Sequence, residues 1–124
     1  ELTGLLNRKA MLHRLEHAIS YCNRYQTNCA VLSIDLDGLK AVNHALGYHY
    51  GDQLLSKVAT RIQAVIRDAD ILARVGGDKF VAILTHLNHI NDAKRVTVRI
   101  NQALMTAFEL NDEPHYISAS IGIA

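Results

Sequence analysis

Apolar residues recur at helical spacing along three stretches of the chain. The first stretch begins after Asn7, whose side chain can cap a helix, and ends around residues 23–28. The second, residues 51–67, keeps the helical period throughout and is the clearest helix of the chain. The third follows Asn88 or Asn91, either of which can cap it. The pattern therefore predicts three long amphipathic helices.

Shorter apolar runs predict four strands. Residues 29–34 form a nearly continuous run, which is typical of a buried central strand. Residues 71–75 and 80–84 flank a Gly-Gly-Asp segment whose composition suits a tight hairpin turn. Residues 116–123 alternate weakly and predict a last strand.

Residues 38–50 and 109–114 lack a sustained period and predict irregular segments, the first with one helical turn around residues 39–43. After the first helix, the order of elements is strand, helix, strand, strand, helix, strand, which is the split pattern of ferredoxin-like sheets. We therefore expect an α+β fold with an extra N-terminal helix. Its mainly antiparallel sheet would have the spatial strand order 4-1-3-2, with both connecting helices on one face. Residues 1–124 show no internal boundary and make one domain.

This topology brings two acidic residues together. Asp35 follows the first strand and Asp78 lies at the hairpin tip, and both positions fall at the same edge of the sheet. Converging carboxylates repel one another unless a cation lies between them, and Mg²⁺ prefers such oxygen ligands. Lys40, just beyond Asp37, could reach a substrate phosphate that the metal orients. The alternative is that Asp35 and Asp37 end a strand and that Asp78 serves only the turn.

Composition narrows the function only slightly. The 124 residues are 49% hydrophobic and 20% charged with a net charge of +1, so no nucleic-acid binding follows from charge. Cys22 and Cys29 lack the spacing of metal ligands and suit a reducing compartment. No apolar run approaches the roughly 18 residues of a membrane span, and no signal peptide is visible. We expect a cytoplasmic domain without membrane contact of its own, alone or attached to a membrane sensor, excised from a longer protein.

Five short segments form one further pattern. They are Leu2 to Arg8; Asp35 to Lys40 with Asn43; Gly47 with Gly51 and Asp52; Arg74 to Phe80; and Ser118 to Ala124. In this order they resemble the GGDEF domain of the diguanylate cyclase family, although each segment alone is weak. The resemblance implies a nucleotide-cyclase-like fold. The family's domain continues with a further helix and a final strand, so the resemblance also implies that this chain is truncated at its C-terminal end.

The resemblance implies a reaction and its metal ligands. Family members condense two GTP molecules into cyclic di-GMP and release pyrophosphate, and two facing domains each present one GTP, so an active state is a homodimer. By position, Asp35 and Asp78 would bind Mg²⁺ (or Mn²⁺) through their carboxylates, and Leu36 through its backbone carbonyl. Lys40 matches a phosphate contact, although a solvated surface charge is the alternative.

Two polar residues match the positions that read the guanine base. Asn43 supplies an amide and Asp52 a carboxylate, which suit the donors and acceptors on the edge of guanine. The alternatives are that Asn43 only caps a loop and that Asp52, in the first turn of its helix, only complements the helix dipole.

The signature hairpin departs from the active pattern at one decisive position. Gly76, Gly77 and Asp78 match the family, but Lys79 occupies the place of the catalytic glutamate. A lysine adds positive charge beside the expected dication and does not readily accept a proton, so Lys79 is expected to be non-functional in catalysis. It would face the phosphates or lie in solvent. Smaller departures follow the metal aspartates and Asn43: Gly38, Leu39 and His44.

A second site is better preserved. Arg67 and Asp70 precede Gly76 at the spacing of the family's inhibitory site for cyclic di-GMP, and Arg74 lies on the same hairpin. Arginine can fork onto a phosphate or a guanine edge, and a carboxylate can accept from guanine N–H groups. The alternative is a helix-end arginine paired with an exposed aspartate.

Three functions follow from these residues. The first is a GGDEF domain with impaired or absent cyclase activity that binds GTP or cyclic di-GMP as a regulatory module. The second is an active diguanylate cyclase that tolerates Lys79, and the third is a structural dimerisation module. Fused sensor and phosphodiesterase domains are the expected neighbours in the longer protein.

Overall fold

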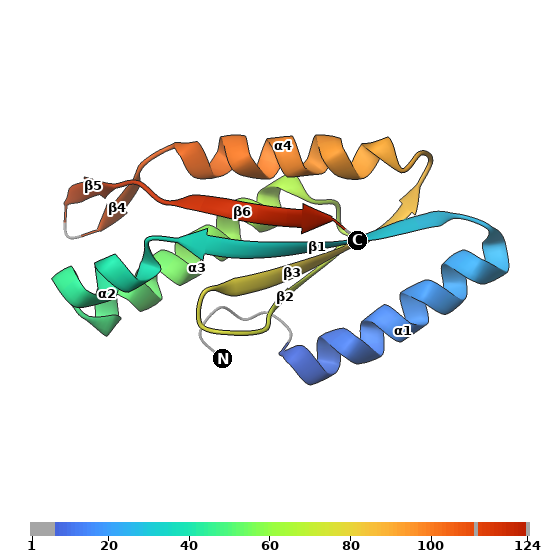
Figure 1. The fold of residues 1–124 in the computed structure, drawn as a ribbon, viewed down its shortest axis with the longest axis horizontal. Coiled ribbons are helices and arrows are strands. Elements are labelled where there is room, and N and C mark those ends of the chain that lie inside the picture. Colours follow the sequence, from blue (N-terminus) through green and yellow to red (C-terminus); the bar gives the residue numbers. More distant parts are fainter. Residues whose placement is uncertain (1–6, 111, 124) are drawn as a thin grey trace.

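Residues 7–110 and 112–123 are described by a computed structural model of the chain, whose ribbon is shown in Figure 1. Residues 2–6 of the first family segment and Ala124 of the last therefore lie outside the described residues. In chain order the elements are α1 (Arg8–Tyr25), β1 (Asn28–Asp37), α2 (Leu39–Leu46), α3 (Tyr48–Val65), β2 (Ile71–Arg74), β3 (Lys79–Leu87), α4 (Asn91–Met105), β4 (Phe108–Leu110), β5 (Glu113–His115) and β6 (Ser118–Ile123).

The main sheet has the predicted order and direction of strands. Its order is β2-β3-β1-β6, and each neighbouring pair is antiparallel. Strands β6, β1, β3 and β2 are thus the expected strands 4, 1, 3 and 2, and the α+β prediction is confirmed. The long apolar run of β1 places it at the centre of the sheet, where both of its edges are paired.

The two faces of the sheet are covered by different helices. On one face, Leu32 and Ile34 of β1 pack in a core that includes residues of α3 and α4 such as Ile62 and Ile100. On the other face, α1 packs Met11 and Ala18 against residues of β2 and β3. Figure 1 shows the sheet between α1 and α4, with α3 behind it. Both connecting helices therefore share one face, as right-handed crossovers require.

Residues 38–50 are more helical than their pattern predicted. They form α2 and the first turn of α3, which begins at Tyr48 and not near residue 51. Gly38 and Gly47 have φ angles of 97° and 92°, so these glycines mark the boundaries of a short helix where we expected an irregular segment. The prediction that Asp52 lies in the first turn is also wrong, because four helical residues precede it.

Two further local predictions fail. Neither Asn88 nor Asn91 caps α4: Ile90 holds the N-cap position, and His89 Nδ1 accepts a hydrogen bond from the backbone N–H of Asn91 at 3.1 Å. Asp92 Oδ2 in turn accepts from the backbone N–H of His89 at 3.1 Å. We expected a simple loop over residues 109–114, but Phe108–Leu110 and Glu113–His115 pair as the antiparallel strands β4 and β5. By contrast, Asn7 caps α1 as expected, since its Oδ1 accepts from the backbone N–H of Ala10 at 2.8 Å.

Arg61 ties α3 to the end of α4. Its guanidinium donates hydrogen bonds to the backbone carbonyls of Ala103 at 3.1 Å, Thr106 at 2.5 Å and Ala107 at 2.7 Å. The same group lies 3.6 Å from the centroid of the Phe108 ring, within the range of a cation–π contact. One side chain therefore satisfies carbonyls that the C-terminus of α4 leaves unpaired.

Replacing Arg61 with methionine is expected to lower the free energy of unfolding by about 2 kcal/mol. The substitution keeps most of the apolar stem but removes the charged hydrogen bonds and the ring contact. Urea unfolding followed by circular dichroism measures the loss. The same change at exposed Arg14 of α1 is the control and should cost less than about 0.5 kcal/mol. Equal losses in the two variants would contradict the assigned role.

Candidate functional site

The end of β1 and the tip of the β2–β3 hairpin lie side by side. Asp35 is directly opposite Lys79 of β3 and Ser120 of β6. The backbone N–H of Leu36 donates to the carbonyl of Asp78 at 2.9 Å, which joins the strand end to the hairpin tip. The fold therefore brings together Asp35, Leu36 and Asp78, the residues that the sequence grouped as metal ligands.

Lys79 faces Asp35 across the two strands. Its Nζ lies 4.0 Å from Asp35 Oδ1, and the two side chains are 62% and 49% exposed. Such an exposed ion pair contributes at most about 1 kcal/mol to stability. Its importance is local, because the ammonium neutralises one of the carboxylates expected to hold the metal.

Asp37 is held by the neighbouring strand. Its Oδ2 accepts hydrogen bonds from Ser118 Oγ at 3.2 Å and from Ser120 Oγ at 3.4 Å. Within residues 7–110 and 112–123, no three His, Cys, Asp or Glu side chains gather in an arrangement that could hold a metal ion. With Lys79 beside Asp35 and Asp37 bound to serines, the side chains present do not fit a resident divalent cation.

The two predicted guanine-binding residues come from neighbouring helices. Asn43 lies on α2, and its Oδ1 is buried without a hydrogen-bond partner. A Cβ atom built on Gly51 of α3 would lie 1.7 Å from this oxygen, so Asn43 occupies space that only glycine leaves open. Asp52 follows Gly51 and is exposed beside a shallow groove of about 520 Å³. Lys40 is exposed on α2, one helical turn before Asn43.

Gly51 itself was not singled out as a site residue by sequence reasoning. Its spacing belongs to a family segment, but the reason for a glycine there appears only when α2 and α3 are packed together. The close approach makes Gly51 a positioning residue for Asn43.

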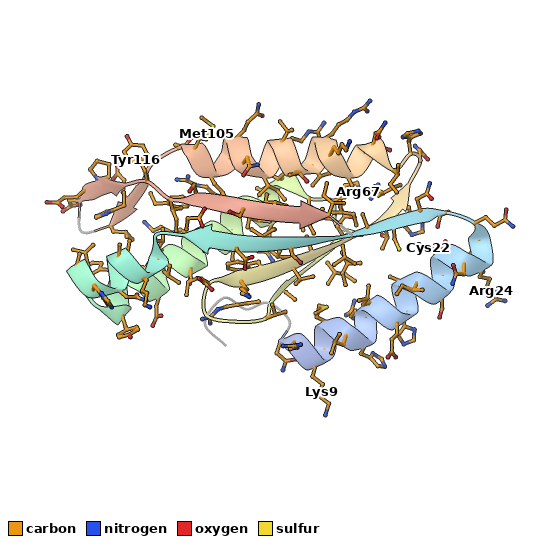
Figure 2. All side chains as sticks on the ribbon, viewed as in Figure 1. Lys9, Cys22, Arg24, Arg67, Met105 and Tyr116 are labelled. Atoms are coloured by element: carbon orange, nitrogen blue, oxygen red, sulfur yellow. The ribbon has the colours of Figure 1, made fainter. Side chains whose placement is uncertain are left out.

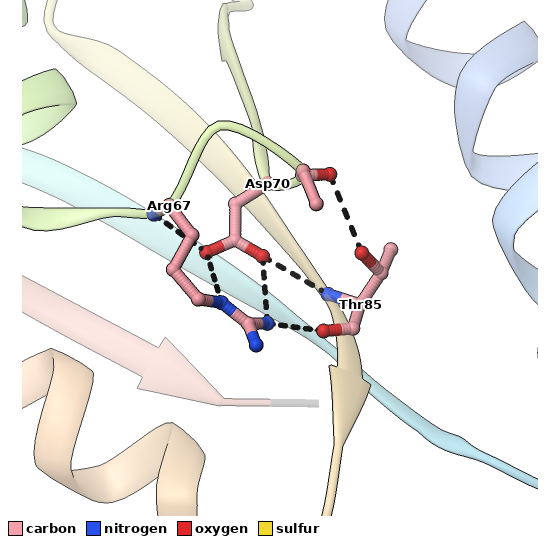
Figure 3. A network of polar contacts seen from close by, with 4 residues as sticks. Arg67, Asp70 and Thr85 are labelled. Carbon is pink, nitrogen blue, oxygen red and sulfur yellow. Dashed lines mark hydrogen bonds and ion pairs between the residues drawn. The ribbon is translucent and has the colours of Figure 1, made fainter.

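The Arg67–Asp70 pair forms a closed network, drawn in Figure 3. The side chain of Asp70 is 1% exposed, and that of Arg67 is 52% exposed. Asp70 accepts hydrogen bonds from Arg67 N (2.9 Å), Nε (3.2 Å) and Nη2 (3.0 Å), and from the backbone N–H of Thr85 (3.2 Å). Arg67 Nη2 also donates to the Thr85 carbonyl. The hydrogen bonds that the Arg67 guanidinium donates to the Asp70 carboxylate raise the pKa of Arg67.

This network differs from the alternative that the sequence left open. Arg67 does pair with Asp70, but the aspartate is buried and not exposed. Both of its oxygens accept hydrogen bonds from the protein. A guanine that bound Asp70 would have to replace some of these bonds.

A cavity of about 190 Å³ lies beside the network, between the end of α3, strand β3 and α4. Besides Arg67, it is lined by Arg95 and Arg99, which lie one turn apart on α4, and by His86. Figure 2 shows Arg67 at the end of the molecule where α4 begins. Sequence reasoning missed Arg95 and Arg99, although their spacing of four residues places them on one face of a helix.

Arg74 contributes to the signature hairpin. Its Nε donates to the carbonyl of Gly76 at 3.1 Å, and its Nη2 donates to that of Gly77 at 3.2 Å. These bonds fix the turn that carries Asp78 and Lys79. Within the described residues, the contacts of the Arg74 guanidinium are with the hairpin itself, so Arg74 stabilises the turn.

The strand order of the sheet and the meeting of the β1 end with the Gly-Gly-Asp hairpin agree with the family that the sequence resembles. The sequence matches the family described as "Diguanylate cyclase, GGDEF domain" over residues 1–124. The chain therefore belongs to this family, whose members generally use a divalent metal ion.

The chain is similar in sequence to several characterised proteins of this family. It is 44% identical over 123 residues to MucR of Pseudomonas aeruginosa, a bifunctional diguanylate cyclase/cyclic di-GMP phosphodiesterase, and 37% identical over 124 residues to the diguanylate cyclase TpbB of the same organism. The matches cover 99% of this chain but only 18% of MucR and 28% of TpbB.

Solved structures agree with the fold. The GGDEF domain of TpbB from Pseudomonas aeruginosa superposes with a TM-score of 0.96 at 36% identity, covering 99% of this chain and 72% of that chain. The GGDEF domain of DgcB from Caulobacter crescentus, solved in complex with cyclic di-GMP, superposes with a TM-score of 0.90 at 26% identity, covering 99% of this chain and 74% of that one. Among the described residues, no helix is both long and apolar enough to cross a membrane.

Proposed function

We propose that the chain is a GGDEF domain of a larger cyclic di-GMP signalling protein that binds GTP or cyclic di-GMP with little or no turnover. The observation that carries this proposal is Lys79, which holds the position of the family's catalytic glutamate and pairs with Asp35. An ammonium group cannot accept the proton of an attacking hydroxyl. It also places a positive charge where the family's chemistry uses a negative one.

The nucleotide-binding half of the site is retained. Asn43 and Asp52 are proposed to read the guanine base, and Lys40 to contact the phosphates. The support is their arrangement at the junction of α2 and α3, where Gly51 leaves room for Asn43. Only the active alternative needs Mg²⁺ or Mn²⁺, with Asp35, Asp78 and the carbonyl of Leu36 as the predicted ligands, and in it Lys79 would have to move away from Asp35.

Cyclic di-GMP is proposed to bind at Arg67 and Asp70. Arg67, Arg95 and Arg99 line one cavity together with Asp70 and Asp92, and the guanidinium groups suit phosphate oxygens. In this arrangement Arg67 reaches the ligand with its exposed side, while Asp70 continues to hold the guanidinium in place.

Active cyclase function is the second candidate, because the chain is 44% identical to a relative named as a bifunctional cyclase. Such an activity would need a homodimer in which each domain presents one GTP. Fused sensor and phosphodiesterase domains belong to the same proposal, since the chain spans only a small part of its relatives.

The experiment uses the full-length protein. Calorimetry with GTP and with cyclic di-GMP measures binding, and chromatography of the products after incubation with GTP and Mg²⁺ or Mn²⁺ measures turnover. Binding without turnover is the expected result. Formation of cyclic di-GMP that Asp35→Ala abolishes would instead establish the active cyclase, and binding of neither ligand would leave a structural dimerisation module.

Gly51→Ala is expected to weaken GTP binding at least about tenfold, as much as Asn43→Ala does, while the unfolding midpoint changes little. The new methyl group displaces the end of a flexible side chain, and alanine favours the helix, so the fold is retained. Calorimetry with the single and double variants tests this. The double variant should bind no more weakly than Asn43→Ala alone, and additive losses would contradict the positioning role.

A further inference from the structure

The pairing of Lys79 with Asp35 has a specific geometry. The two residues are direct partners in the register of β1 and β3, so their side chains leave the sheet on the same face. The ammonium is 4.0 Å from the carboxylate, and both groups are exposed to an incoming ligand. The next carboxylate on this face, Asp37, is bound by two serine hydroxyls.

Charge at this position favours a phosphate over a metal ion. Lys79 already neutralises Asp35, so a dication gains less from this carboxylate and is repelled by the ammonium. A triphosphate is attracted by the same ammonium. Lysine has three N–H donors, so Lys79 can donate to a phosphate oxygen and to Asp35 at the same time.

We infer that Lys79 takes the place of a divalent cation, so that this site binds a nucleoside triphosphate without Mg²⁺. The inference rests on the proposed function, since it concerns the same nucleotide. The inference goes beyond the proposed function in one respect. It states that a side chain of the protein, and not a metal ion carried with the substrate, neutralises the phosphates. Lys40, on the adjacent helix α2, supplies a second ammonium for the same phosphates.

The test compares GTP binding by the full-length protein in excess EDTA and in excess Mg²⁺ at constant ionic strength. For the wild type we expect the dissociation constant to differ by less than about threefold between the two buffers. For Lys79→Glu we expect binding to weaken at least about tenfold in EDTA, because the carboxylates of Asp35, Asp78 and position 79 then face the phosphates without a cation. Lys79→Gln, which has no charge at this position, should fall between these two.

Each outcome bears on a different statement. Wild-type binding that is lost in EDTA overturns this inference and leaves the proposed function standing. The inference is equally overturned if Lys79→Glu and the wild type respond alike to EDTA. If GTP binds in neither buffer but cyclic di-GMP does, the inference fails while the regulatory function is retained. If neither GTP nor cyclic di-GMP binds, the proposed function is overturned as well.

Discussion

Lys79→Glu is expected to raise the rate at which the full-length protein forms cyclic di-GMP from GTP at least about 100-fold. This is the lower range for the contribution of a restored acid–base group. The substitution removes the ammonium that lies 4.0 Å from Asp35 and puts a carboxylate in its place. The site then has carboxylates at Asp35, Asp78 and position 79, a donor set that can hold Mg²⁺. Product formation from GTP and Mg²⁺, followed over time by chromatography, measures the change.

Two controls separate the carboxylate from the loss of charge. Lys79→Gln removes the ammonium without supplying a base, so it should leave turnover near the wild-type level. Asp35→Ala in the Lys79→Glu background should abolish the gain. If Lys79→Glu binds GTP but forms no product, the obstacle lies elsewhere, and the departures at Gly38, Leu39 and His44 are the next residues to restore.

Turnover in Lys79→Glu should also depend on protein concentration. Each domain is proposed to present one GTP, so the reaction requires two copies. The rate per molecule should rise with concentration until the dimer saturates, whereas GTP binding to each copy should stay constant. A rate per molecule that is independent of concentration, in a protein shown to be monomeric by sedimentation, would contradict the two-copy reaction.

The order of strands could be predicted because it depends on local patterns. The long apolar run of β1 marks a central strand, and the Gly-Gly-Asp turn joins β2 to β3, which in turn pairs with β1. Together with the handedness of the crossovers, these patterns suffice to bring Asp35 near Asp78. The cap at Asn7 could be predicted for the same reason, since its partner is only three residues away.

Features that depend on register or on packing could not be predicted. Lys79 meets Asp35 only because β1 and β3 pair in one register, and a shift of one residue would turn the side chain to the other face. Asp70 is held by the backbone N–H of Thr85, which lies on β3 and fifteen residues further along the chain. Gly51 and Asn43 come together only when α2 and α3 pack, so neither glycine spacing nor composition reveals that contact.

Asp70→Ala is expected to lower the free energy of unfolding by about 3 kcal/mol. Its carboxylate is almost fully buried and accepts four hydrogen bonds, two of them from backbone N–H groups of Arg67 and Thr85. Without it, these donors lose their acceptors in a place that water enters poorly, and the Arg67 guanidinium loses its partner. Chemical denaturation of the wild type and the variant, without any nucleotide, measures the loss.

The neighbouring exposed residue gives a matched control. Asp68→Ala removes the same charge two residues away and should change stability by less than about 0.5 kcal/mol. Because the pKa of Arg67 is raised in the folded protein, the ion pair with Asp70 contributes its full stabilisation below the ordinary pKa of arginine. That stabilisation is lost only as the pH rises through the raised pKa of the folded state. Arg67 stays charged at both about pH 6 and about pH 8, so its part of the stability loss caused by Asp70→Ala should be the same at the two pH values. If Asp70→Ala weakened cyclic di-GMP binding without loss of stability, Asp70 would be a ligand contact and not a structural clamp.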